Sequence, residues 1–195
     1  MSMFGWTGAR STIVEPAPLA VTEPKLRRLA PDGSAAILAG IARSFDRLAP
    51  GYGVATRLRI CHFLAQAAHE TDAFRTLEEY GGPAYFIRHE GRRDLGNTQA
   101  GDGVRYHGRG IFQLTGRANY RRFGQLLGID LEAEPEHAKD PAIALAVAFA
   151  YWHERGIGAA ADADDVERVT KLINGGRNGL AERARYLTLA KTIWT

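Results

Sequence analysis

The stretch F-L-A-Q-A-A-H-E, residues 63–70, is a nearly all-apolar run that ends in an ionisable pair. Apolar residues in and before this run recur at helical spacing on two neighbouring faces: Val54, Leu58, Cys61, Leu64 and Ala68 on one, and Ile60, Phe63 and Ala67 on the other. A helix that is apolar on both faces is a buried one. The sequence therefore predicts a core helix whose C-terminal end bears Glu70.

Glu70 at such a position is a candidate general acid. Desolvation and the partial negative charge of the helix terminus both disfavour a charged carboxylate there. A carboxylic acid that keeps its proton near neutral pH suits general acid catalysis. The alternative is an ordinary surface glutamate just past a helix end, and this segment alone does not decide between the two.

The composition indicates one globular domain. With 195 residues, 45% of them hydrophobic and 24% charged, the chain can form a packed core. The single cysteine, Cys61, excludes an internal disulfide and a cysteine zinc site, and we expect it to be a small buried hydrophobe. The net charge of +3 would suit a polyanionic partner but is too small to indicate nucleic acid.

Targeting signals are not visible in the sequence. The start, M-S-M-F-G-W at residues 1–6, lacks the basic and apolar regions of a signal peptide. No apolar run approaches transmembrane length. We therefore expect a protein that is made in a cytoplasm without a signal peptide and does not insert stably into a membrane.

Proline, glycine and apolar periodicity divide the chain. Residues 1–30 contain Pro16, Pro18 and Pro24 and are expected to form an extended arm or linker with little helix or strand, which leaves residues 31–195 as the folded domain. Residues 71–115 are rich in Gly, Arg and Asp and predict a small irregular lobe with a little sheet, from β-like pieces at 85–87 and 111–114. Helices are predicted over residues 35–48, about 54–70, 119–127, 141–156, 165–173 and 180–194.

The segment G-R-G-I-F-Q-L-T-G-R-A-N-Y, residues 108–120, is the densest polar cluster. In a strand, Gln113 and Thr115 would point to the same face because side chains alternate. An amide and a hydroxyl on one face suit the hydroxyl and acetamido groups of a sugar, or can hold a water molecule. The alternative is a glycine-rich hairpin with incidental polar residues.

The segment L-I-N-G-G-R-N-G, residues 172–179, is the second cluster. A helix stop at Asn174-Gly175 and an N-cap at Asn178 would explain its glycines. That interpretation leaves the choice of Asn174 and Arg177 open.

Carboxylates follow Glu70 at Glu78, Glu79, Glu90 and Asp94. Any one of them is most often a solvated charge. Paired with a neutral Glu70 across a cleft, one could be a general base that activates water, as in inverting glycosidases.

Several other functional classes are disfavoured because the sequence lacks residues that they require. Ala73 stands where an H-E-x-x-H metalloprotease motif needs its second histidine. No G-K-[ST] follows a glycine-rich turn, and no G-x-S-x-G is present. The arginine pairs at 27–28, 92–93 and 121–122 are scattered and favour solvated faces over a nucleic-acid surface.

Four ordered motifs together resemble glycoside hydrolase family 19, and more narrowly its phage and prophage endolysins, the chitinase-like lysozymes. They are A-H-E-T-D-A-F (68–74), Y-F-I-R-H-E-G-R-R-D-L-G-N (85–97), G-D-G-V-R-Y-H-G-R-G-I-F-Q-L-T-G-R-A-N-Y (101–120) and L-I-N-G-G-R-N-G-L (172–180). The resemblance runs from about residue 35 to the end of the chain. It implies a mainly α (α+β), lysozyme-like fold of two lobes with a cleft between them, the smaller lobe irregular and β-containing.

The resemblance also implies roles for individual residues. The Glu of the H-E motif, Glu70, would be the general acid, and Thr115 would help hold the attacking water. The second carboxylate lies nine residues after the first in related endolysins, which favours Glu79. A Tyr-containing segment of plant chitinases points instead to Glu90, which remains the alternative base. Candidates for substrate contact are Gln113, Asn119, Tyr120, Asn174 and Arg177.

The expected activity is hydrolysis of the β-1,4 bond between N-acetylmuramic acid and N-acetylglucosamine in bacterial peptidoglycan. The expected enzyme is a monomer without metal or organic cofactor that reaches the wall after release from the cytoplasm of a bacterial host. Two rival hypotheses are a chitinase and a catalytically inactive wall-binding module. Intact Glu70 and Thr115 argue against the second rival because binding needs neither.

Overall fold

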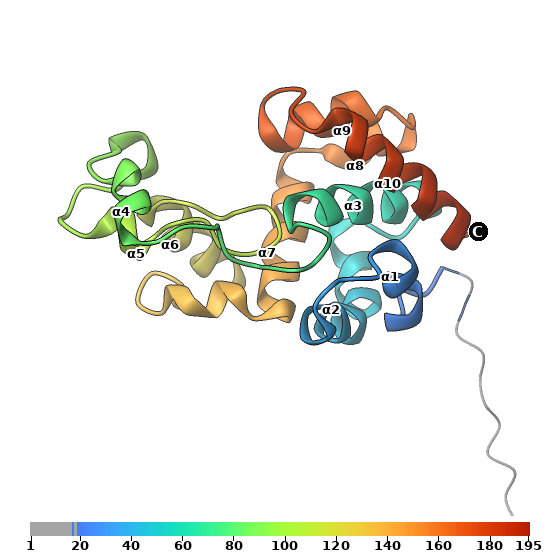
Figure 1. The fold of residues 1–195 in the computed structure, drawn as a ribbon, viewed down its shortest axis with the longest axis horizontal. Helices are drawn as coiled ribbons and strands as arrows, with labels where there is room; N and C mark the ends of the chain where they lie inside the picture. The colour runs from blue at the N-terminus through green and yellow to red at the C-terminus, as the bar shows by residue number, and fades with distance from the viewer. Residues whose placement is uncertain (1–16, 18) are drawn as a thin grey trace, which may run out of the picture.

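The computed structural model describes residue 17 and residues 19–195, and the chain folds into two lobes, as predicted (Figure 1). The larger lobe contains α1, α2, α3, α8, α9 and α10, and the smaller one contains α4, α5 and α6, with α7 between them. The helices are α1 (Glu23–Leu29), α2 (Ala35–Leu48), η1 (Ala49–Tyr52), α3 (Arg57–Glu70), α4 (Pro83–Phe86), η2 (Ile87–His89), η3 (Arg93–Leu95), α5 (Asp102–Arg105), α6 (Arg117–Leu127), η4 (Pro135–Lys139), α7 (Pro141–Glu154), α8 (Ile157–Asp162), α9 (Val166–Asn174) and α10 (Leu180–Ile193).

Helix α3 is the buried centre of the larger lobe, as its two apolar faces predict. It begins after Thr56, whose hydroxyl accepts the Arg59 backbone N–H, and every residue from 60 to 68 is buried. The Phe63 ring lies 5.8 Å from Phe45 and 4.6 Å from Phe149, measured between ring centroids. Helix α10 packs along α3 on another side. The core therefore fixes the direction in which the last turn of α3 presents Glu70.

Buried residues of helices α2 and α7 extend the hydrophobic core toward the smaller lobe. The Asp140 side chain accepts the N–H groups of Ala142 and Ile143 at 2.8 and 3.1 Å, which confirms the predicted helix start. A Cβ atom on Gly40 would lie only 2.5 Å from the Cβ of Pro141. Glycine is therefore required where the two helices pack against each other.

The N-terminal segment differs from the expected arm. Residues 1–16 and 18 lie outside the described residues, but the expectation of an arm through residue 30 is wrong for its last part, because residues 23–29 form α1. Val21, Leu26 and Leu29 are buried in the core. Pro24 lies in the first turn of α1, where proline is tolerated, so it starts a helix too short to show clear periodicity.

Truncating Leu26 to alanine is expected to lower the free energy of unfolding by about 2–5 kcal/mol, because its side chain is fully buried. For a domain of this size that corresponds to roughly 5–15 °C in Tm. Thermal unfolding measures it, with Leu126→Ala as the control because Leu126 is 53% exposed. Equal midpoints for the two variants would mean that the segment before residue 31 does not support the core.

The smaller lobe is less β-like than predicted. Residues 85–87 belong to α4 and η2, so the predicted β piece there is wrong. In residues 19–195 the backbone pairs as β-structure only at the isolated bridges Glu78–Arg109 and Arg109–Leu114. Aromatic packing forms this lobe's own small core, which includes Tyr106, Leu114, Tyr120, Phe123 and Leu131. Among the described residues, no helix is long and apolar enough to cross a membrane.

Candidate active site

A hollow of about 420 Å³ lies where the last turn of α3 faces the smaller lobe. Glu70, Glu79 and Thr115, the three predicted catalytic residues, all line it. The complete lining is His69, Glu70, Asp72, Thr76, Glu78, Glu79, Tyr80, Tyr85, Gln113 and Thr115. Carboxylates, a hydroxyl, an amide and exposed tyrosines make this surface suited to a hydroxyl-rich ligand such as a glycan.

Arg183 holds Glu70 in place. Its Nη2 donates to Glu70 Oε1 at 2.5 Å, its Nη1 donates to Gln66 Oε1 at 2.5 Å, and its Nε donates to the Asn178 carbonyl at 3.1 Å. The Arg183 side chain is 2% exposed and that of Glu70 is 18% exposed. Each of the three guanidinium nitrogens thus has an acceptor, and one carboxylate oxygen of Glu70 is fixed, while the other accepts no hydrogen bond within residues 19–195.

The ion pair between Arg183 and Glu70 is a feature of the site that the sequence analysis did not predict. In a proton-transfer step it would stabilise the carboxylate that remains after the proton has left. No local pattern could indicate this contact, because Arg183 lies 113 positions from Glu70.

A left-handed turn after α3 brings the next carboxylates back to the hollow. Asp72, Ala73 and Phe74 have φ values of 49°, 56° and 58°, and the Phe74 side chain is completely buried. Left-handed backbone is costly for Ala and Phe, so this turn is maintained by its packing. The chain then runs back to the bridge at residue 78, which puts Glu78 and Glu79 opposite Glu70.

Glu79 is held by the glycine-rich segment of the smaller lobe. Its backbone N–H donates to the Gly108 carbonyl at 2.9 Å, and its Oε2 accepts the Gly108 N–H at 3.0 Å. Arg88 forms an ion pair with Oε1. A Cβ on Gly108 would lie 3.2 Å from Glu79 Oε2 and 2.6 Å from Gln113 Oε1, so glycine is required for this packing. Donors on both carboxylate oxygens therefore hold Glu79 in one position at the edge of the hollow.

Glu78 has a different environment. It accepts hydrogen bonds from His107 Nε2 at 3.0 Å and Lys139 Nζ at 3.2 Å, and Arg109 lies nearby. Burial works against its charged form, but the hydrogen bonds from His107 and Lys139 outweigh burial, so the pKa of Glu78 is lowered. Its carboxylate thus connects His107 and Arg109 to Lys139 of η4.

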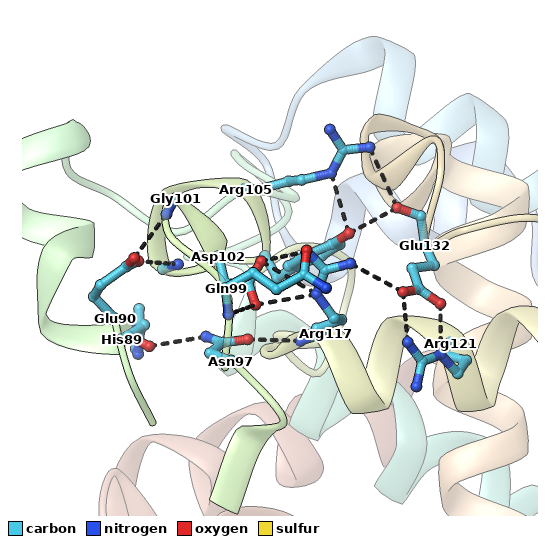
Figure 2. A network of polar contacts seen from close by, with 12 residues as sticks. His89, Glu90, Asn97, Gln99, Gly101, Asp102, Arg105, Arg117, Arg121 and Glu132 are labelled. Atoms are coloured by element: carbon cyan, nitrogen blue, oxygen red, sulfur yellow. Dashed lines mark hydrogen bonds and ion pairs between the residues drawn. The ribbon is translucent and has the colours of Figure 1, made fainter. Parts of the chain in front are cut away.

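Glu90, the alternative base, does not line the hollow. Its carboxylate oxygens accept the backbone N–H groups of Gly101 and Gly103, both at 2.7 Å (Figure 2). A larger hollow of about 850 Å³ near this loop is lined by Asp102, Arg117 and Glu132, whose charges pair with one another. Glu90 therefore shapes the loop of the smaller lobe, away from Glu70.

Gln113 and Thr115 share the hollow, but not because of a strand. Gln113 has a φ of 52° and its Nε2 donates to the Gly110 carbonyl at 3.1 Å. The Thr115 hydroxyl donates to the Gln113 carbonyl at 2.9 Å. A left-handed residue within a tight loop therefore turns both side chains toward the hollow, and the alternation expected of a strand plays no part.

The other predicted contact residues lie around this centre. Asn119 donates from Nδ2 to the Thr115 carbonyl at 2.7 Å and supports the loop. Tyr120 is completely buried, and its hydroxyl donates to the His107 carbonyl at 2.8 Å, so the prediction of a direct substrate contact is wrong for this residue. Its ring completes the apolar core of the lobe. Asn174 caps the turn after α9, and Arg177 pairs with Glu167, and neither lines the hollow.

Thr115→Ala is expected to remove most of the hydrolytic rate, whereas Thr115→Ser is expected to retain much of it. The reason is that a hydroxyl at this position can hold water, and in the described residues no base contacts it to make it a nucleophile. Steady-state rates of the two variants measure the difference. A covalent glycosyl adduct on Thr115 would contradict the water-holding role.

Comparison with known proteins decides the family. The sequence model of the family described as chitinase class I, Glyco_hydro_19, matches residues 34–166. The chain belongs to glycoside hydrolase family 19. It is therefore a chitinase-like glycoside hydrolase, and the predicted family is confirmed.

Individual relatives of this family 19 chain come from bacteria and plants. A glycosyl hydrolase family 19 domain-containing protein of Haemophilus influenzae is 30% identical over 161 residues, which cover 68% of this chain and 78% of that protein. Endochitinase 1 of Theobroma cacao is 32% identical over 165 residues, 69% of this chain and 51% of that protein. The chain thus spans about half the length of that plant enzyme.

Solved structures show the same fold. Chitinase C from Streptomyces griseus HUT6037 superposes with a TM-score of 0.75 at 22% identity, covering 92% of this chain and 78% of that one. The class IV family 19 chitinase from Zea mays superposes with a TM-score of 0.66 at 20% identity, covering 90% and 92%. These likenesses confirm the predicted mainly helical, lysozyme-like fold. Within the described residues, no group of three or more His, Cys, Asp or Glu side chains is arranged to hold a metal ion.

Proposed function

We propose that this family 19 chain hydrolyses a β-1,4 glycosidic bond with inversion at the anomeric carbon. Glu70 protonates the leaving oxygen, Glu79 takes a proton from water, and Thr115 holds that water. The observation that supports this most directly is that both carboxylates and the Thr115 hydroxyl line one hollow, while Glu90 does not. Inversion needs space for a water molecule between the two carboxyl groups.

The proposed substrate is bacterial peptidoglycan, cut between N-acetylmuramic acid and N-acetylglucosamine, as in an endolysin. The net charge of +3 supports this choice because walls carry anionic peptides, whereas chitin is neutral. Chitin is the second candidate, and the endochitinases of Theobroma cacao and Gossypium hirsutum among the relatives favour it.

Two measurements test the proposal. Proton NMR of fresh product is expected to show the α-anomer first, and an initial β-anomer would exclude inversion. Mass spectrometry of muropeptides from digested walls is expected to show N-acetylmuramic acid at the new reducing end. Release of sugars from N-acetylglucosamine oligomers, with no release from walls, would establish the chitinase instead.

A further inference from the structure

A second hollow adjoins the catalytic one. It shares Gln113 and Thr115 with that hollow and has a volume of about 400 Å³. Residues of the 112–115 loop, α6 and α7 form it, together with Leu95 of η3 and with Arg155, which directly follows α7. Its wall is apolar at Phe112, Phe123 and Val147, and its charged members are Arg122, Glu154 and Arg155. It is therefore a part-apolar, part-cationic space immediately beside the proposed reacting bond.

The charges of the second hollow do not cancel. Arg122 pairs with Glu154, with 3.0 Å between Nη2 and Oε1. Arg155 donates from Nη1 to the Leu172 carbonyl at 3.1 Å, and its guanidinium lies 4.6 Å from the centroid of the Tyr151 ring. No carboxylate in residues 19–195 lies within ion-pair distance of Arg155. One exposed guanidinium, oriented by a carbonyl and an aromatic ring, is thus available to an external anion.

We propose that the second hollow binds the acidic peptide borne by N-acetylmuramic acid, with a peptide carboxylate on Arg155. This inference rests on the proposed function. The peptide leaves the sugar sideways through its lactyl group, so an enzyme that cuts next to this sugar needs room beside the cleft. Guanidinium and carboxylate match as a bidentate pair. The apolar wall takes the methyl groups of the alanine units, which buries apolar surface.

A polymer of N-acetylglucosamine has no such side chain and carries no charge. The second hollow would then contribute to the choice between the two candidate substrates, through binding of the peptide and not through the chemical step. The expected signature is a change in KM for peptide-bearing substrate, with kcat little affected.

The experiment compares purified walls with the same walls from which an amidase has removed the peptides. Arg155→Gln is expected to raise KM for peptide-bearing walls about 5-fold and to leave peptide-free strands within about 2-fold, the scale of one exposed ion pair. Arg155→Lys should recover part of the loss. Glu154→Gln should act in the opposite direction, lowering KM about 2- to 3-fold, because it releases Arg122 from its partner.

Arg47→Gln on α2 is the matched control, since it removes one exposed positive charge from a helix that does not line either hollow. Salt should reduce the difference between wild type and Arg155→Gln, because exposed charges are screened. Equal losses on both substrates, or no loss on either, would overturn the peptide site while leaving the proposed function intact. Absence of cleavage of both wall substrates by the wild type, with cleavage of chitin oligomers, would overturn both.

Discussion

Glu70→Gln is expected to lower the rate of glycan hydrolysis by about 10²- to 10⁴-fold, the contribution of a general acid. Glutamine keeps the size of the side chain, and its carbonyl oxygen can still accept the Arg183 hydrogen bond that measures 2.5 Å in the wild type. It has no acidic proton to give to the leaving oxygen. The measurement is kcat on purified substrate, with thermal unfolding of the same preparation to show that the variant is folded.

Glu23→Gln is a suitable control for this experiment. The Glu23 side chain is 41% exposed and pairs with Arg27 on its own helix, far from the lining of the hollow, so the substitution removes one carboxylate without affecting the hollow. Near wild-type hydrolysis by a folded Glu70→Gln variant would exclude Glu70 from proton transfer. The ion pair between Glu70 and Arg183 would then contribute only to the stability of the fold.

Glu79→Gln is expected to cause a loss of similar size, about 10²- to 10⁴-fold, because an amide cannot take a proton from water. Its carbonyl oxygen can still accept the Gly108 N–H, at 3.0 Å in the wild type, so the loop should stay in place. Rates measured at equal fractions of folded protein test this. The loss should appear in kcat, since the role is in the chemical step.

Glu90→Gln is the matched variant for Glu79→Gln, with the same change of charge in the same lobe. It should remain active and should unfold at a lower temperature, because one of the two backbone N–H groups at Gly101 and Gly103 would face an amide NH₂ instead of a carboxylate oxygen. The reverse result, an inactive Glu90→Gln and an active Glu79→Gln, would show that the base was assigned to the wrong residue.

Helix prediction succeeded where the pattern was local and strong. The period of α3 and the Asp140-Pro141 start of α7 are both contained in a few adjacent residues. It failed for α1, where seven residues give barely two turns of periodicity and Pro24 indicated irregular chain. The prediction also placed the N-cap of α10 at Asn178, whereas the capping residue is Gly179, whose backbone is left-handed. Glycine is required there because a Cβ atom would lie 2.2 Å from the His69 ring. That contact is tertiary and has no local signal.

The residues of the candidate site likewise include some that local sequence motifs identified and others that only the tertiary structure shows. Glu70, Glu79 and Thr115 were identified from short motifs, and the structure brings them into one hollow. Arg183 was missed because an arginine within a helix that carries several charged residues looks like any solvated charge, although its side chain is 2% exposed. Tyr120 was misassigned because a motif shows which residues are near a site, but not which way each side chain points.

The pairing of Glu70 with Arg183 also sets a condition on biosynthesis. A ribosome that has translated residues 1–179 has already made Glu70, Glu79 and Thr115, but the arginine that orients the acid has not yet been added. Helix α10 must then pack along α3. The Trp194 indole N–H, which donates to the Ala20 carbonyl at 3.2 Å, connects the end of α10 to the segment before α1. Nascent chains that end before residue 183 therefore lack the side chain that orients Glu70, and the site is complete only after α10 has left the ribosome and packed on α3.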